Sequence, residues 1–144
     1  MRELRVERKE NMAGGKGHVI IKHILEDKEL NGKCKMYAEV TLEPGCSLGY
    51  HEHHNESETY YILRGEGNYD DNGRIRPVKA GDVTFTPDGM GHGLTNTGDT
   101  DLVFVALIFR MLLIALNTED LFGSLVVIGF MTHIAIQVFI NIAV

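Results

Sequence analysis

Short apolar runs separated by turn residues recur from residue 18 to residue 109. The runs are rich in β-branched and aromatic residues, which favour strands over helices. Clusters of Asn, Asp, Gly and Pro stand between them and are typical of turns. The runs are HVIIKHIL, KMYAEVTL, TYYILRG, RIRPV, DVTFTP and DLVFVALIF. Strands at this spacing, with no helical period between them, predict an all-β fold of the sandwich or jelly-roll barrel kind.

One turn is predicted in more detail. The stretch YDDNGRI places Asn72 and Gly73 between two runs of strand-forming residues. An Asn-Gly pair favours the two-residue type I′ turn because both residues tolerate positive φ angles. We therefore expect a β-hairpin centred on these two residues.

The stretch GCSLGYHEHHNESETYYILRG, residues 45–65, concentrates histidines and glutamates next to a predicted strand. Side chains two positions apart lie on the same face of a strand, so His51 and His53 can face one cavity. Glu58 begins the next strand, and His92 begins a returning strand after the turn PDGMG. Three imidazoles and one carboxylate suit one divalent transition metal ion (Mn, Fe, Zn, Ni, Co or Cu) better than Ca or Mg. Without a metal, the four would be hydrogen-bonded polar core residues.

Strand alternation predicts which neighbours of these four residues face the same cavity and which face away from it. Tyr60 is predicted on the same face as Glu58, where its phenol would contact a substrate as a catalytic residue or would simply pack in the core. His54 follows His53 directly and is predicted to face away from it. Glu52 and Glu56 are predicted to be solvated residues at the rim of the site.

The spacing of these residues resembles the two sequence motifs of the cupin family. The first motif is matched at Gly45, His51, His53, Glu58 and Gly65, and the second at Gly81, Pro87, Gly89, His92 and Asn96. The resemblance covers most of residues 18–109. It implies a conical jelly-roll β-barrel, a homodimer formed through the barrel, and metal ligands His51, His53, Glu58 and His92.

Composition limits where such a domain acts. The formal net charge is −6, and no basic stripe is present, which argues against nucleic-acid binding. Two cysteines, Cys34 and Cys46, lie far apart without a CxxC spacing. This usage fits a reducing compartment, so we expect a cytoplasmic location.

Three segments are predicted along the chain. Residues 1–17 form a charged N-terminal arm, residues 18–109 form the β-barrel, and residues 110–144 form a hydrophobic C-terminal tail. Residues 121–144 contain no Asp, Glu, Lys or Arg, and they are long enough to cross a bilayer as a helix. We therefore predict a helical tail that is able to associate with a membrane.

The tail also resembles a fragment of the SEDS family of rod-shape and cell-division membrane proteins. The resemblance rests on RMLLIALNTEDLFGSLVVIG and on Gln137, Ile140, Asn141 and Ile142. It covers about 34 residues at the C-terminal end of the sequence, a small part of that family's length. A native membrane anchor, an accidental gene fusion and an engineered addition all remain open for this tail.

Three functions are compatible with the sequence. The first is a metal-dependent enzyme of the cupin type, a dioxygenase, decarboxylase or isomerase, acting on a small organic acid or sugar. The second is a non-catalytic, metal-dependent sensor or binding module for such a molecule, with the tail as an anchor. The third is a structural partner of a membrane complex, which rests on the tail alone. Fold by itself does not choose among them.

Overall fold

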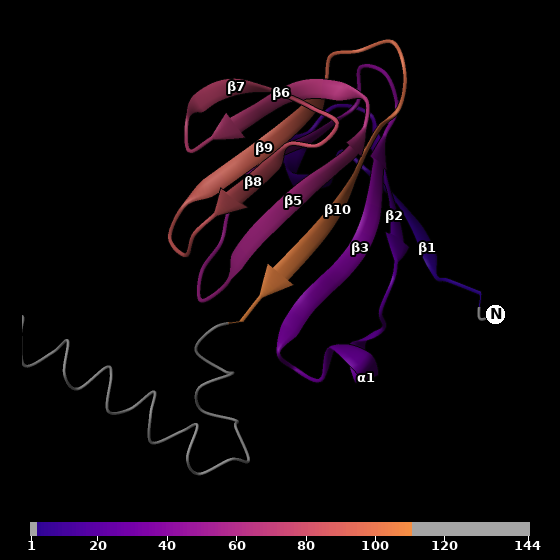
Figure 1. Ribbon diagram of the computed structural model, residues 1–144, viewed down its shortest axis with the longest axis vertical. Helices are drawn as coiled ribbons and strands as arrows, with labels where there is room; N and C mark the ends of the chain where they lie inside the picture. Colours follow the sequence, from indigo (N-terminus) through magenta and orange to yellow (C-terminus); the bar gives the residue numbers. More distant parts are fainter. Residues whose placement is uncertain (1–2, 111–144) are drawn as a thin grey trace, which may run out of the picture. The chain divides into compact units, whose positions relative to one another are not determined.

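The computed structural model describes residues 3–110 of the chain. These residues form two antiparallel β-sheets, and helical structure among them is limited to single turns (Figure 1). The six-stranded sheet has the order β1 (Val6–Glu10), β2 (His18–His23), β3 (Cys34–Leu42), β10 (Leu102–Phe109), β5 (Ser57–Arg64), β8 (Val83–Thr86). The four-stranded sheet has the order β4 (Ser47–Glu52), β9 (Gly91–Asn96), β6 (Glu66–Asp71), β7 (Arg74–Lys79). The helical turns are η1 (Met12–Gly14) and α1 (Asp27–Leu30). The predicted all-β fold is confirmed.

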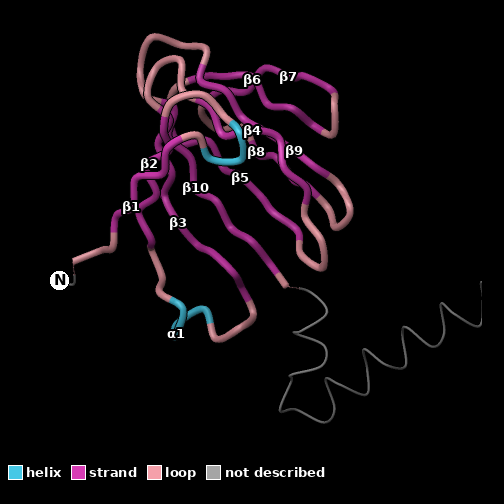
Figure 2. The backbone as a smooth tube through the Cα atoms, turned by 180° about the vertical axis from the view of Figure 1, so that it is seen from behind, coloured by secondary structure: helices cyan, strands magenta, loops and turns pink. Residues whose placement is uncertain are grey.

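One hydrophobic core lies between the two sheets. β10 runs through the six-stranded sheet between β3 and β5 (Figure 2), and its alternate residues Leu102, Phe104 and Ala106 are almost completely buried. Leu48 and Leu94 face them from β4 and β9 and are buried in the same cluster. Apolar side chains therefore alternate along the strands so that one face of each sheet points to the core, as a jelly-roll barrel requires.

The predicted hairpin is confirmed. β6 pairs with β7 so that Asp71 lies opposite Arg74, which leaves only Asn72 and Gly73 in the loop. Their φ angles are 53° and 89°, both in the left-handed region that a type I′ turn demands.

Two of the motif residues stabilise the chain rather than line the site. Gly65 has a φ of 81°, and a Cβ atom there would lie 2.5 Å from the Asp101 carbonyl oxygen, so only glycine fits. The Asn96 side chain is buried and donates hydrogen bonds of 2.8 Å to the carbonyl oxygens of Leu42 and Thr100. Asn96 thereby ties the end of β9 to the end of β3 and to the loop that leads into β10.

The N-terminal segment takes part in the sheet. Residues 6–10 of the predicted arm form β1, which pairs along its whole length with β2 and makes one edge of the six-stranded sheet. The sequence does not reveal this strand because an edge strand needs only one buried face, and Val6 is 59% exposed.

The tail lies outside the described residues. Its predicted helix, its resemblance to the SEDS family and its predicted membrane role all concern residues 111–144. Within residues 3–110, no helix is both long and apolar enough to cross a membrane.

Candidate metal centre

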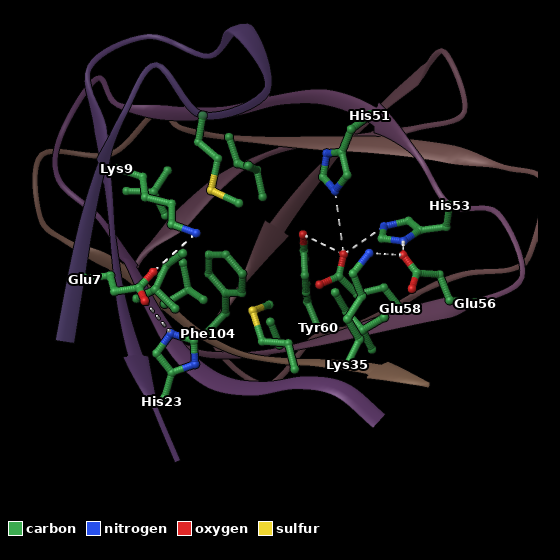
Figure 3. Close-up of a pocket in the computed structure, with 18 of the residues that line it drawn as sticks. Glu7, Lys9, His23, Lys35, His51, His53, Glu56, Glu58, Tyr60 and Phe104 are labelled. Carbon is green, nitrogen blue, oxygen red and sulfur yellow. Dashed lines mark hydrogen bonds and ion pairs between the residues drawn. The ribbon is translucent and has the colours of Figure 1, made fainter. Parts of the chain in front are cut away.

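Four side chains from three strands converge between the two sheets. His51 lies near the end of β4, and His53 follows that end. Glu58 and His92 are the second residues of β5 and β9. Their four candidate ligand atoms all lie within 4.8 Å of one another. Glu58 Oε2 is 2.8 Å from His92 Nε2, 3.0 Å from His53 Nε2 and 3.8 Å from His51 Nε2. Figure 3 shows His51 and His53 reaching toward the Glu58 carboxylate.

A β-bulge in β4 brings His51 to the inner face. Leu48 lies opposite Leu94, but His51 lies opposite His92, so β4 carries one more residue than β9 between these pairs. Simple alternation from the buried Leu48 would turn Tyr50 inward and His51 outward. The extra residue reverses this phase: Tyr50 is 44% exposed, and His51 faces the centre.

The rings of His51 and His53 are each oriented by a contact at Nδ1, on the side of the ring away from the centre. His51 Nδ1 donates to the Gly49 carbonyl oxygen at 3.0 Å, and His53 Nδ1 faces the Glu56 carboxylate at 3.4 Å. These partners can only accept, so Nδ1 carries the proton in both rings, and Nε2 directs its lone pair to the centre. The sequence reading that placed Glu56 on a solvated rim is wrong, because its side chain is only 11% exposed and also pairs with Lys35 at 2.8 Å.

His92 is held in an equivalent way. Its Nδ1 lies 3.0 Å from the Tyr69 hydroxyl, which is itself 2.6 Å from the Thr86 hydroxyl. When Tyr69 donates to Thr86, its oxygen accepts from His92 Nδ1, and His92 Nε2 again points to the centre. The sequence reading did not assign Tyr69 or Thr86 to the site. Both lie on strands whose pairing had to be known before their side chains could be placed beside His92.

The electrostatics of the centre favour a negative Glu58 next to neutral and positive imidazoles. Burial by itself raises the pKa of Glu58. When protons instead of a metal occupy the histidine Nε2 atoms, hydrogen bonds from the three histidines outweigh burial and leave this pKa far below its usual value. The hydrogen bond with Glu58 raises the pKa of His53, whereas burial lowers the pKa of His92. Burial also raises the pKa of Tyr60 far above its usual value, so the phenol stays protonated and donates to Glu58 Oε2 at 3.1 Å.

The donor set fits a divalent transition metal ion. With Nδ1 protonated on each ring, three Nε2 lone pairs and a carboxylate oxygen face one another, and His53 Nε2 and His92 Nε2 are only 3.0 Å apart. Four acceptors this close need a cation among them, either protons or a metal. An ion about 2.1 Å from each ligand places neighbouring donors about 3.0 Å apart at right angles and opposite donors about 4.2 Å apart. The separations of 2.8 to 3.8 Å lie within or close to this range.

The residues beside the centre follow the predicted alternation. Tyr60 and Ile62 are buried on the inner face of β5, while Tyr61 and Leu63 are 48% and 42% exposed on the outer face. The His54 side chain is 69% exposed and lies beside Glu52, 3.4 Å away, so it does not point to the centre. The predicted orientation of His54 is therefore confirmed.

A cavity of about 410 Å³ opens from the centre into the barrel. His51, His53, Glu58 and Tyr60 form one part of its lining. Its size falls in the range of about 300–1,000 Å³ that is usual for small-molecule sites. A two-layer β-barrel in which three histidines and a glutamate converge beside such a cavity defines a class of all-β proteins whose side chains are arranged as a set of metal ligands.

Comparisons with known proteins identify this class. The Cupin domain family matches residues 38–108. The chain is 49% identical over 109 residues to the oxalate-binding protein of Thermotoga maritima, covering 76% of this chain and 90% of that protein. It is 37% identical over 73 residues to an oxalate decarboxylase of Bacillus subtilis, covering 47% of this chain and 19% of that protein. This chain belongs to the cupin family.

A solved structure agrees with the fold. The crystal structure of a predicted oxalate decarboxylase from Thermotoga maritima matches with a TM-score of 0.73 at 48% identity. The match covers 75% of this chain and 94% of that one. The described domain and this structure therefore share the same all-β architecture over nearly the whole length of the relative.

Proposed function

We propose that this protein binds one divalent transition metal ion through His51, His53, Glu58 and His92, and that it holds a small organic acid at that metal. The observation that carries the proposal is that three imidazole rings converge on one buried carboxylate, Glu58. Each ring is hydrogen-bonded through Nδ1 on the side that faces away from this carboxylate. A metal ion held there supplies Lewis-acid attraction for a carboxylate oxygen of the ligand. The similarity to a protein named for binding oxalate supports an acid as the ligand.

Tyr60 is the proposed contact for the bound acid. It lines the cavity beside Glu58 and keeps its proton at neutral pH. A phenol has one O–H to donate, and Tyr60 gives it to Glu58 Oε2 at 3.1 Å. When Glu58 binds the metal, this O–H can turn to a carboxylate oxygen of the acid instead, and Tyr60 then holds the acid without accepting a proton from it. The partial match to an oxalate decarboxylase makes decarboxylation of the bound acid the second candidate function. The predicted homodimer remains a prediction.

The acid should bind only when metal is present. Titrating oxalate into manganese-loaded protein by calorimetry is expected to show saturable binding, and chelator-treated protein is expected to show none. Tyr60→Phe should weaken binding about five- to tenfold, because one hydrogen bond to a charged oxygen is lost. His54→Ala, whose side chain faces solvent, should leave binding unchanged. Equal binding with and without metal would contradict the proposal.

The same samples distinguish binding from catalysis. Oxalate incubated with metal-loaded protein stays intact if the protein only binds it, and it is consumed if the protein is a decarboxylase. Tyr60→Phe serves as the matched variant in both measurements.

A further inference from the structure

The cavity is much longer than the metal centre requires. It continues from His51 and Glu58 past the inner faces of β10, β3 and β2 to β1. β1 and β2 are separated from β5, which carries Glu58, by β3 and β10. With about 4.8 Å between neighbouring strands, β2 lies roughly 14 Å from β5 along the sheet. In Figure 3, Glu7, Lys9 and His23 lie on the opposite side of the cavity from His51 and His53, with Phe104 between the two groups.

The middle of this cavity is apolar. Its walls include Met12, Ile21, Met36, Leu48, Phe104 and Ile108. Met12 and Met36 are only partly buried and pack against the core from the cavity side. Methionine side chains adapt their shape to what they contact, so this wall can accept ligands of different outline. Burying a carboxylate or a sugar hydroxyl against this apolar wall would not strengthen binding, because the polar group would lose its hydrogen bonds to water. Burying a hydrocarbon chain there would strengthen binding.

The cavity offers no unpaired lysine or arginine side chain among the described residues. Arg5, Lys9 and Lys35 are the lysine and arginine side chains that line the cavity in the described part of the chain. Lys9 Nζ lies 3.2 Å from Glu7, Lys35 Nζ lies 2.8 Å from Glu56, and Arg5 pairs with both Glu7 and Glu26. Every cation of the cavity is therefore already paired with a carboxylate. A second carboxylate on a ligand would have to compete with the carboxylates already paired with these half-exposed cations.

Oxalate leaves most of this space empty. At about 30 Å³ per water molecule, 410 Å³ corresponds to the space of roughly a dozen waters, whereas oxalate displaces only a few. We infer that the cavity is built for an acid with an oxalate-like head, a carboxylate next to a carbonyl group, and an uncharged apolar tail of about four to six carbons along Met12, Met36 and Phe104. This inference rests on the proposed function, because the head must sit at the metal.

A series of 2-oxo acids tests this inference, since every member keeps the same head. We expect calorimetry on manganese-loaded protein to show affinity rising from pyruvate through 2-oxobutanoate and 2-oxohexanoate to 2-oxooctanoate, whose tails lengthen from one carbon to about six. Each methylene buried against the apolar wall should contribute about a fourfold gain. The diacid 2-oxoadipate, which adds a carboxylate at the far end, should bind more weakly than 2-oxohexanoate.

Variants of the apolar wall test whether the rise in affinity with tail length comes from contacts with Met12 and Met36. Met12→Gln and Met36→Gln keep the side-chain length but make the wall polar, so each should remove most of the gain from the longer tails. Oxalate affinity, measured on the same samples, should stay within about twofold and so reports that the head site is folded. Met90→Gln is the matched control, because Met90 is 42% exposed and does not line the cavity.

Two failures can be told apart. If oxalate binds in a metal-dependent way but affinity does not rise along the series, the apolar-tail inference is wrong and the proposed function stands. If neither oxalate nor any 2-oxo acid binds to metal-loaded protein, the proposed function is wrong and the inference falls with it.

Discussion

Restoring manganese to chelator-treated protein is expected to raise its midpoint of thermal unfolding by about 15 °C. A ligand that binds only the folded state, at a free concentration about a thousand times its dissociation constant, adds about 4 kcal/mol to the free energy of unfolding. For a domain of this size each kcal/mol moves the midpoint by roughly 4 °C. The effect should be large because the unfolded chain cannot bring His51, His53, Glu58 and His92 together.

Two variants test whether the metal-induced shift comes from the assigned ligands. His53→Ala removes one ligand whose ring nitrogen lies 3.0 Å from both Glu58 and His92, so the metal-induced shift should nearly vanish. His54→Ala should keep the full shift, because its side chain is 69% exposed. A shift that survives in His53→Ala but disappears in His54→Ala would mean that the assigned ligands are wrong.

Phe104→Ala is expected to lower the free energy of unfolding by about 3 to 5 kcal/mol. Phe104 is fully buried on β10, in the middle of the six-stranded sheet, and its ring centroid lies 4.5 Å from that of Tyr60. Alanine would remove these contacts and enlarge the neighbouring cavity. Urea denaturation monitored by circular dichroism measures the change.

Phe85→Ala is the matched control for this prediction. Phe85 lies on β8 and is 57% exposed, so its loss should change the free energy of unfolding by less than about 0.5 kcal/mol. Both variants should be measured at two protein concentrations, because a dimer would make stability depend on concentration. A loss below about 1 kcal/mol for Phe104→Ala would show that β10 does not carry the core as described.

The fold and the four candidate ligands were predictable because local signals determine them. Turn residues separate the strands, Asn72 and Gly73 set one hairpin, and the i, i+2 spacing puts His51 and His53 on one side. The spacing to Glu58 and His92 matches the cupin motifs residue by residue. The structure brings all four side chains together.

The parts that could not be predicted depend on pairing between distant strands. The bulge before His51 exists only relative to the register of β9, and Tyr69 reaches His92 only because β6 pairs with β9. Glu56 looks like a polar loop residue until Lys35 and His53 are placed on either side of it. Strand β1 carries no apolar alternation because its inward residues, among them Glu7 and Lys9, line a cavity instead of the core.

The metal content of the purified protein tests the central claim most directly. Full-length protein prepared without chelator or an affinity metal would be analysed for transition metals by mass spectrometry, together with His53→Ala and His54→Ala. We expect one transition metal ion per chain in the unaltered protein and in His54→Ala, and almost none in His53→Ala. Folded protein that takes up no transition metal even when Mn, Fe, Zn, Ni, Co and Cu are each supplied would contradict the account.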